Sequence, residues 1–481
     1  MYPIASHWLN YIDGQWSDSS QRLTVNNPGT AEPVATIAQA TVADAERALL
    51  AARRCADSGL LTRARPAQRV TWLLRIAEEI RAVADEGAWV LCQENGKRLS
   101  DARDEFIEAA RYFEYYAGMA DKIEGTSIPL GNGYMDFTLY DPMGVSAQIV
   151  PWNFPVSICA RSLAPALAAG NAVVIKSPEL SPLGMCVLIR AIANAGLPDG
   201  AVNLICGRGR EVGSYLVSHR AVDQIVFTGS VPTGQSILRD AAQHAIPSVM
   251  ELGGKSAAIA FADADREQLL ASVQSGIFFN AGQVCSAMSR LLVQREIYED
   301  VVEAVVAMAE GLSVGLGQDN ADLTPVVSAG QLTGIEALCR RAIAEGAVAV
   351  TGGEAFADRA GHFMRPTVFR DVTADMCIAQ EEVFGPVLAI MPFDTEEQAI
   401  AIANGTEFGL VAGVFTQDIS RAMRCTRRLK SGQVFVNEWY AGGIETPFGG
   451  VGLSGFGREK GQEALYSYVR TKNVAIRIAG E

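Results

Sequence analysis

Short apolar segments alternate with helical patterns over residues 144–252, and this alternation limits the possible folds more than any other feature. The predicted strands lie at residues 144–150, 172–176, 202–206, 223–228 and 247–251. Between them, helices are predicted near residues 156–169, 182–195, 209–218 and 232–243. Such alternation predicts a parallel, doubly wound α/β domain, because each helix returns the chain to the start of the next strand.

A second α/β series follows residue 253. Its predicted strands lie at residues 289–293, 347–351, 386–391, 410–415 and 432–436, and its helices at residues 296–310, 329–345, 395–403 and 418–429. Helices at residues 44–56, 66–84 and 104–121 are expected to cover one face of the first domain. Because 481 residues are too many for one ordinary core, we expect at least two domains.

Two extended runs surround Gly131-Asn132-Gly133, a typical turn sequence, and predict a β-hairpin over residues 127–140. Residues 467–478 alternate as a further strand would. An isolated hairpin is marginal in water and exposes edges that can pair with another strand. We therefore expect these segments to need a partner.

Composition excludes several classes of protein. The net charge of −14 argues against a nucleic-acid or anionic-membrane partner. Residues 1–16 lack the pattern of a signal peptide, and no apolar run is long enough to span a membrane. The nine cysteines show no CxxC pair, which argues against a disulfide framework or a metal site. We expect a soluble, cytoplasmic, enzyme-sized protein.

One cysteine occupies an unusual position. Cys285 lies between a helical pattern at residues 265–279 and the strand at 289–293, among small residues and with no charge beside it. A free cysteine is usually a small buried hydrophobe, but an exposed thiol in a turn can also act as a nucleophile. The residues around Cys285 leave both interpretations open.

Three other motifs bear on this choice: Pro-Trp-Asn-Phe-Pro at 151–155, Glu-Leu-Gly-Gly-Lys at 251–255 and Glu-Glu-Val-Phe-Gly-Pro at 381–386. Together with residues 278–287, they resemble the NAD(P)-dependent aldehyde dehydrogenase superfamily, in the family's order and over nearly the whole chain. The resemblance implies oxidation of a small-molecule aldehyde to the carboxylic acid.

The resemblance also implies the assembly. The cofactor domain would comprise residues 1–124 and 142–252, and the catalytic domain residues 253–462. Residues 125–141 and 463–481 would form an arm that pairs with another subunit in a homodimer or homotetramer.

The predicted strand at 223–228 leads into Thr228-Gly-Ser-Val-Pro-Thr-Gly234, which opens a helix. Glycines there let the backbone approach a pyrophosphate at the helix N-terminus, although the same spacing also suits a tight turn without a ligand. The usual G-x-G-x-x-G fingerprint is absent, and Gly207 to Gly209 match it only in part. In the family that this chain resembles, the corresponding loop lies at the cofactor.

By resemblance, Lys176 and Glu179 hold the adenosine ribose, and Glu382 and Phe384 contact the nicotinamide ribose. A carboxylate at Glu179 would repel a 2′-phosphate, which favours NAD over NADP. Out of context, Lys176 and Glu179 would be a solvated surface pair, and Glu381-Glu382 an exposed charge run. The complete predicted cofactor set is Ile149, Pro151, Trp152, Lys176, Glu179, Gly229, Ser230, Gly234, Leu252, Glu382 and Phe384.

Three residues match the family's catalytic positions. Cys285 would add to the carbonyl, and Asn153 would donate its side-chain amide to the oxyanion beside the Cys285 backbone N–H. Glu251 would activate the water that hydrolyses the thioester, if burial raises its pKa towards neutrality. Taken alone, Asn153 would be a turn cap and Glu251 an edge salt bridge.

Other functions are less consistent with the sequence. Only four histidines occur and none lies in a motif near Cys285, so a Cys–His thiol hydrolase or esterase is the weaker enzyme hypothesis. Glu251 favours the hydrolytic branch over CoA-acylating relatives, which generally lack it. A catalytically inactive scaffold protein would be expected to lose Asn153, Glu251 or Cys285.

The substrate pocket is expected to include Ile158, Arg161, Phe279, Val284 and Phe448, together with the loop at residues 438–446. Arg161 follows Asn153 by just over two helical turns, so it could bind the far carboxylate of a small anionic semialdehyde. Alternatively, Arg161 pairs with a buried carboxylate or lies at a subunit contact. Ser162 stands where many relatives carry a lysine, so a proton relay to Glu459 is in doubt.

Overall fold

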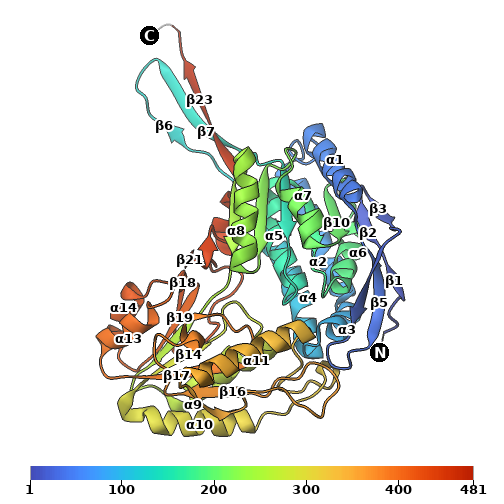
Figure 1. Ribbon diagram of the computed structural model, residues 1–481. Coiled ribbons are helices and arrows are strands. Elements are labelled where there is room, and N and C mark those ends of the chain that lie inside the picture. Colours follow the sequence, from blue (N-terminus) through green and yellow to red (C-terminus); the bar gives the residue numbers. More distant parts are fainter. Residues whose placement is uncertain (1, 480–481) are drawn as a thin grey trace.

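The computed structural model describes residues 2–479. It contains two large β-sheets with helices packed on them, and a projecting arm (Figure 1). The first sheet has the order β22-β12-β11-β8-β9-β10-β2-β3. Its five central strands are parallel: β8 (Val145–Ile149), β9 (Ala172–Ser177), β10 (Val202–Cys206), β11 (Gln224–Thr228) and β12 (Ser248–Glu251). These strands confirm the predicted doubly wound arrangement.

Helices cover both faces of this sheet. One core joins one sheet face to α2 (Pro66–Ala82), α3 (Ala84–Asn95), α4 (Leu99–Ala117), α5 (Pro155–Ala169) and α6 (Leu183–Asn194). The other joins the opposite face to α1 (Val42–Ser58), α7 (Ser214–Val217) and α8 (Val231–Ala241). Along β9, Val173 faces the first core and Val174 the second, as expected of a strand buried on both sides.

The first half of the chain departs from prediction in four respects. The helix predicted at 104–121 begins earlier, at Leu99, and the helix predicted at 209–218 divides into a π-helical turn, Gly209–Gly213, followed by α7. Helix α3 was not predicted, because it is buried around much of its circumference and lacks a clear polar face. Also unpredicted are the short strands β1 (His7–Trp8), β2 (Asn10–Ile12), β3 (Gln15–Ser17), β4 (Arg22–Asn26) and β5 (Pro33–Ala38).

The second sheet has the order β15-β16-β17-β14-β13-β19-β20. Its strands are β13 (Ala257–Ala260), β14 (Arg290–Gln294), β15 (Val348–Thr351), β16 (Thr367–Arg370), β17 (Val387–Phe393), β19 (Val411–Phe415) and β20 (Gln433–Val436). Five were predicted, but β13 and β16 were missed. Four alanine-rich residues give β13 little strand signal, and only its place inside the sheet makes it a strand.

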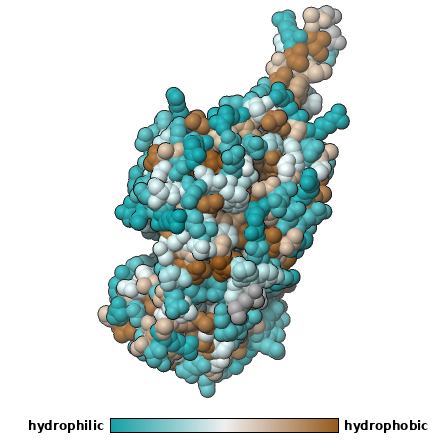
Figure 2. All heavy atoms as spheres, turned by 90° about the vertical axis from the view of Figure 1, so that its right-hand side faces the viewer, coloured by the Kyte–Doolittle hydropathy of each residue, from teal (hydrophilic) through white to brown (hydrophobic). Residues whose placement is uncertain are grey.

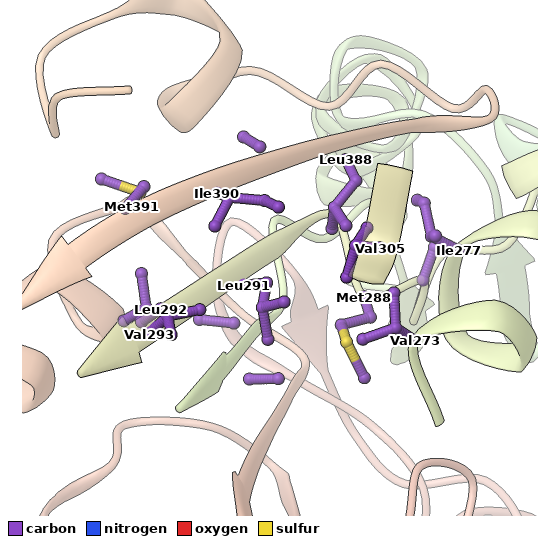
Figure 3. Packing of buried hydrophobic residues seen from close by; sticks show 14 of the residues in the cluster. Val273, Ile277, Met288, Leu291, Leu292, Val293, Val305, Leu388, Ile390 and Met391 are labelled. Carbon is purple, nitrogen blue, oxygen red and sulfur yellow. The ribbon is translucent and has the colours of Figure 1, made fainter. Parts of the chain in front are cut away.

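The core of the second sheet packs against its helices (Figure 3). Leu291 of β14 and Leu388 of β17 lie near Val305 of α10 (Tyr298–Glu310) and Ile277 of the segment before Cys285. The remaining long helices are α11 (Ala329–Ala344), α13 (Glu396–Ala403) and α14 (Ile419–Arg428), close to the predicted ranges. This packing fixes the segment that carries Cys285 to a rigid sheet.

The predicted helix at 265–279 changes character before Cys285. Helix α9 (Arg266–Val273) is capped by the Asp265 side chain and passes into a π-helical turn, Gln274–Phe278. Asn280 and Ala281 then take positive φ angles of 49° and 53°. The chain therefore bends sharply just ahead of the cysteine.

The predicted hairpin is confirmed. Strands β6 (Ser127–Ile128) and β7 (Tyr134–Pro142) form it, and β23 (Val469–Arg477) pairs with the whole of β7. The three strands project from the body of the molecule (Figure 1). Hydrophobic residues lie on this arm (Figure 2). Leu130, Tyr134, Met135, Leu139 and Ile476 are all exposed there.

The chain crosses between the two sheets near its end. β22 (Gly455–Phe456) follows the second α/β series but pairs antiparallel with β12 of the first sheet. β18 (Phe408–Gly409) pairs with β21 (Val451–Gly452) just before it. The domain limits given above stay predictions. Over residues 2–479, no helix combines the length and apolar character needed to cross a membrane.

Candidate active site

Two cavities meet at Cys285. One has a volume of about 310 Å³ and the other of about 210 Å³, and Cys285 lines both. It is also the only partly exposed cysteine, because the other eight are buried. Burial raises the pKa of the Cys285 thiol to about 12, although the charge of Arg161 opposes this rise. The thiol is therefore accessible from two sides and needs a proton acceptor to become a thiolate.

Asn153 lies in the turn between β8 and α5. Its side-chain Nδ2 donates to the carbonyl of Gln283 at 3.0 Å, two residues before Cys285. Helix α5 begins at Pro155, and its first free amides are bonded by Glu105 and not by Asn153, so Asn153 is not the turn cap considered above. The amide of Asn153 instead reaches across to the loop that carries the thiol.

Glu251 ends β12 and is only 2% exposed. Within residues 2–479, neither carboxylate oxygen of Glu251 has a hydrogen-bond partner, and neither cavity includes Glu251 in its lining. Burial, together with the nearby charge of Glu459, raises the pKa of Glu251 well above its usual range, while Arg161 lowers it in part. The edge salt bridge considered for Glu251 is not formed in the described part of the chain.

Arg161 forms a buried ion pair with Glu459. The Ser162 hydroxyl lies 3.1 Å from the other oxygen of Glu459 and 2.9 Å from the carbonyl of Ile158. The guanidinium of Arg161 also lies 5.3 Å from the centre of the Phe448 ring. This geometry agrees with the alternative in which Arg161 pairs with a buried carboxylate.

The larger cavity contains all five predicted substrate residues: Ile158, Arg161, Phe279, Val284 and Phe448. Six of its eighteen lining residues are aromatic, and Phe154 stacks on Phe279 with 5.8 Å between ring centres. Pocket residues that the sequence did not reveal are Glu108, Tyr112, Phe154, Ser157, Ser286, Gln433, Phe435, Tyr440, Ala441, Gly442, Gly443 and Lys460. Tyr440, Ala441, Gly442 and Gly443 belong to the loop 438–446, which was expected to line the pocket.

The smaller cavity gathers seven of the predicted cofactor residues: Pro151, Trp152, Gly229, Ser230, Leu252, Glu382 and Phe384. It lies beyond the carboxyl ends of β8 and β11, where the strand order reverses. Ligands bind at this switch point in open α/β sheets. Gln331 also lines the cavity and donates to the Phe384 carbonyl at 2.9 Å, and no motif pointed to it.

The other four predicted cofactor residues lie outside this cavity. Ile149 and Lys176 are register partners at the ends of β8 and β9. The Lys176 ammonium lies 3.8 Å from Glu179, whose carboxylate accepts from the Gly209 N–H at 2.8 Å. Gly234 packs so closely on Leu252 that an added Cβ would lie 2.6 Å from it. These residues occupy the same edge of the sheet as the cavity.

Glu382 is held at the floor of this site, where it accepts from the Gly254 N–H at 3.0 Å. Burial raises the pKa of Glu382 to about 7. Trp152 and Phe384 meet edge to face, with ring centres 5.4 Å apart. Among residues 2–479, no cluster of histidine, cysteine or acidic side chains is suited to hold a metal ion.

Comparison with known proteins agrees with this geometry. The profile of the "Aldehyde dehydrogenase family" matches residues 16–474. The chain belongs to this family. It is 37% identical to the "Putative aldehyde dehydrogenase DhaS" of Bacillus subtilis, over 97% of this chain and 95% of that protein. It is 39% identical to human "Retinal dehydrogenase 2" (97% and 91% covered) and to a "Betaine aldehyde dehydrogenase" of Cereibacter sphaeroides (98% and 97% covered).

Solved structures of aldehyde dehydrogenases superpose closely on the chain. A putative aldehyde dehydrogenase from Burkholderia cenocepacia has a TM-score of 0.95 and 43% identity, with 98% of this chain and 99% of that chain covered. Betaine aldehyde dehydrogenase from Staphylococcus aureus, solved with NAD+, has a TM-score of 0.96 and 36% identity, with 98% and 95% covered. The mixed α/β fold predicted from the sequence is therefore the aldehyde dehydrogenase fold.

Proposed function

We propose that this aldehyde dehydrogenase oxidises its substrate with NAD through a covalent intermediate on Cys285. The position of the Cys285 thiol, at the junction of the two cavities, carries this proposal. The sulfur adds to the carbonyl carbon to give a thiohemiacetal, loss of a hydride leaves a thioester, and water releases the acid. When bound, NAD supplies the acceptor for that hydride.

Asn153 and the backbone N–H of Cys285 would stabilise the oxyanion. The Asn153 amide already points to the Cys285 loop, through its 3.0 Å bond to the Gln283 carbonyl. A donor fixed before the reaction gains most from the charge that develops on the carbonyl oxygen. This supports the role proposed for Asn153.

Glu251 would take a proton from the attacking water. Its raised pKa makes it a stronger base than an ordinary carboxylate once it is ionised. An oxygen of Glu251 lies 2.6 Å from the position that a Cβ on Gly449 would occupy. The carboxylate would therefore have to turn from Gly449 towards Cys285 to act.

The smaller cavity suits the nicotinamide end of a dinucleotide. The turn at Gly229 opens helix α8, whose N-terminus favours a phosphate charge. Glu382 and Phe384 would contact the nicotinamide ribose, while Lys176 and Glu179 would hold the adenosine ribose. The Glu179 side chain is 42% exposed, so its charge faces solvent where a 2′-phosphate would lie. We therefore infer that NAD is preferred to NADP.

The substrate is proposed to be an aldehyde with an uncharged, apolar or aromatic chain. A carboxylate on a semialdehyde would have to compete with Glu459 for Arg161, because that ion pair is already formed. The aromatic wall of the cavity favours apolar contacts instead. Relatives named for retinal and for betaine aldehyde are equally similar to this chain, so identity does not select a substrate.

The arm is proposed to mediate a homodimer or homotetramer. Its open edge and exposed apolar side chains, among them Leu130 and Ile476, support pairing with a second copy. All nine cysteines are free, which supports a reducing, cytoplasmic location.

A panel of neutral, aromatic, cationic and anionic aldehydes, assayed with NAD and with NADP by absorbance of the reduced cofactor, tests this proposal. We expect aldehyde-dependent NADH formation, and higher kcat/KM for a neutral aldehyde than for an anionic one of equal length. Cleavage of activated esters without NAD reduction would favour a thiol hydrolase. Absence of any turnover would favour an inactive scaffold.

A further inference from the structure

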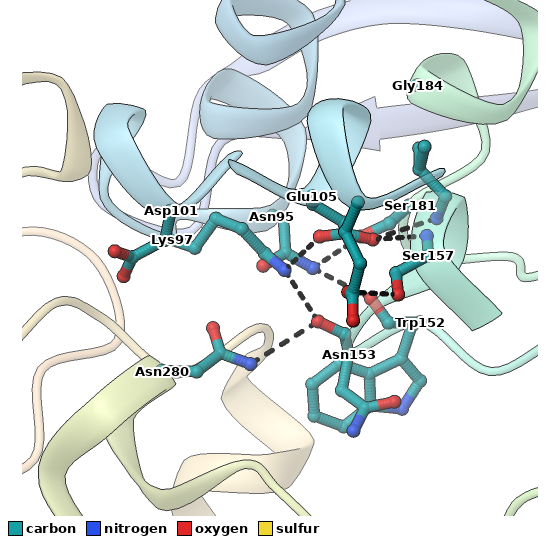
Figure 4. A network of polar contacts seen from close by, with 12 residues as sticks. Asn95, Lys97, Asp101, Glu105, Trp152, Asn153, Ser157, Ser181, Gly184 and Asn280 are labelled. Carbon is teal, nitrogen blue, oxygen red and sulfur yellow. Dashed lines mark hydrogen bonds and ion pairs between the residues drawn. The ribbon is translucent and has the colours of Figure 1, made fainter. Parts of the chain in front are cut away.

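Lys97, between α3 and α4, is a buried cation that no sequence motif singled out. Its side chain is fully buried, and its Nζ donates to Glu105 at 2.6 Å and to the backbone carbonyl of Asn153 at 2.8 Å (Figure 4). The same Nζ lies 4.2 Å from the centre of the Phe154 ring. A buried charge is tolerated only with such partners, so the position of Lys97 is tightly fixed.

Glu105, on α4, holds the other end of the same turn. Its second oxygen accepts from the backbone N–H groups of Val156 at 2.8 Å and Ser157 at 3.1 Å. These amides belong to the first turn of α5, where a carboxylate is favourable and no side chain of the flanking residue provides a cap. Lys97 and Glu105 therefore clamp the Asn153 turn from both sides.

Two asparagines extend this clamp. Asn95 donates to the Trp152 carbonyl at 2.8 Å, and Asn280 donates to the Asn153 carbonyl at 3.3 Å (Figure 4). Asn280 also lies 3.4 Å from the Gln283 carbonyl, which accepts the Asn153 side chain. The Asn153 carbonyl thus joins the α3–α4 loop to the loop that carries the thiol.

We propose that Lys97 and Glu105 are positioning residues that aim the Asn153 side chain at the oxyanion formed on Cys285. Neither residue touches the Cys285 thiol, and each acts through the turn at 151–155. The inference rests on the proposed role of Asn153 as an oxyanion donor. It predicts that loss of Lys97 and loss of Asn153 disturb the same step.

The test compares kcat for Lys97→Met, Asn153→Ala and the double variant at saturating NAD and aldehyde, per folded enzyme. Asn153→Ala should lower kcat about 10²–10³-fold. Lys97→Met should lower kcat about 10–100-fold through misplacement of that donor, with little change in the KM for NAD. Added to Asn153→Ala, it should cost nothing more. Arg103→Met, which breaks the exposed 2.7 Å pair with Asp85 between the same helices, is the control and should leave kcat unchanged.

Several results would overturn the inference. A double variant whose losses multiply would make Lys97 independent of Asn153. A lower Tm of Lys97→Met with an unchanged kcat would make Lys97 a structural residue only. If Lys97→Met does not fold, Glu105→Gln takes its place, since it loses the charge and keeps an acceptor for α5. If Asn153→Ala keeps the wild-type kcat, the proposed oxyanion role fails. A crystal structure of Lys97→Met then decides the positioning claim, which fails if the Asn153–Gln283 bond persists.

Discussion

The two sides of Cys285 are built in contrasting ways. On the Asn153 side, Lys97 and Asn280 both donate to the turn, and the Asn153 amide is itself hydrogen-bonded. On the other side, neither oxygen of the buried Glu251 carboxylate has a hydrogen-bond partner among the residues that the structure describes. A buried polar group without a partner is costly, so it persists where a reaction needs it free.

The difference suits the two roles proposed for Asn153 and Glu251. An oxyanion donor is most effective when it is fixed before charge develops, whereas a base has to move a proton and gains from a pKa near neutrality. On this view, Asn153 is held by its surroundings, whereas the pKa of Glu251 is raised by burial and by Glu459 and lowered in part by Arg161. The experiments below separate these effects, in descending order of expected size.

Cys285→Ala should have the largest effect, because it removes the group that both sides serve. We expect kcat to fall by more than about 10⁴-fold, while NAD binding measured by fluorescence changes little. Cys425→Ala, at a buried cysteine of α14, is the matched control and should keep full activity. Retention of more than a few per cent of kcat in Cys285→Ala would rule out the covalent mechanism.

Glu251→Gln tests the proposed general base and leaves the Asn153 side of Cys285 unchanged. The amide keeps the shape and loses the proton acceptor, so hydrolysis of the thioester should slow about 10²–10⁴-fold. Stopped-flow absorbance should show a burst of NADH followed by slow turnover. Glu381→Gln, at an exposed carboxylate paired with Arg341, is the control. Unchanged steady-state turnover at all pH values would contradict the role of Glu251.

Arg161→Met should raise the pKa of Glu251, the proposed base, still further. The cation lowers the pKa of both Glu251 and Cys285, so its loss raises both values, and each group then ionises only at higher pH. The acidic limb of the kcat/KM profile should therefore move to higher pH, with a loss of about tenfold at pH 6 that shrinks as pH rises.

Arg161→Lys keeps the charge and should preserve most of the profile. A loss confined to anionic aldehydes, with an unmoved pH profile, would instead make Arg161 a substrate anchor. That outcome would restore the semialdehyde hypothesis.

Glu179→Ser should have the smallest effect on catalysis, because Glu179 is proposed to hold the adenosine ribose and lines neither cavity at the thiol. Like charges at a partly exposed site repel by on the order of 1–4 kcal/mol. Removal of the Glu179 charge should therefore lower the ratio of kcat/KM with NAD to kcat/KM with NADP about tenfold. The ratio of kcat/KM for the two cofactors measures this. A wild-type enzyme that favours NADP would contradict the assignment.

Much of the fold followed from periodicity. The long parallel strands and amphipathic helices were predicted, because burial on both faces leaves continuous apolar runs such as β9. Helix α3 and strand β13 were missed, because burial around α3 and the alanines of β13 erase the usual patterns. Their structure depends on tertiary packing, which no local window contains.

Candidate site residues could be named from the sequence where they lie in motifs. Cys285, Asn153 and Glu251 lie in such motifs, and their neighbourhood follows from the resemblance. Lys97 and Glu105 carried no signal, because a lysine and a glutamate eight residues apart resemble an ordinary surface pair. Likewise, Arg161 meets Glu459 only because the fold brings together residues that lie far apart in sequence.

Peptide mass spectrometry of Glu251→Gln, quenched during the slow phase with an aldehyde and NAD, tests the central claim most directly. We predict that the acyl group of the substrate is attached to the peptide that contains Cys285, and that the other eight cysteines stay unmodified. An adduct on another cysteine, or no adduct while NADH has formed, would contradict the mechanism.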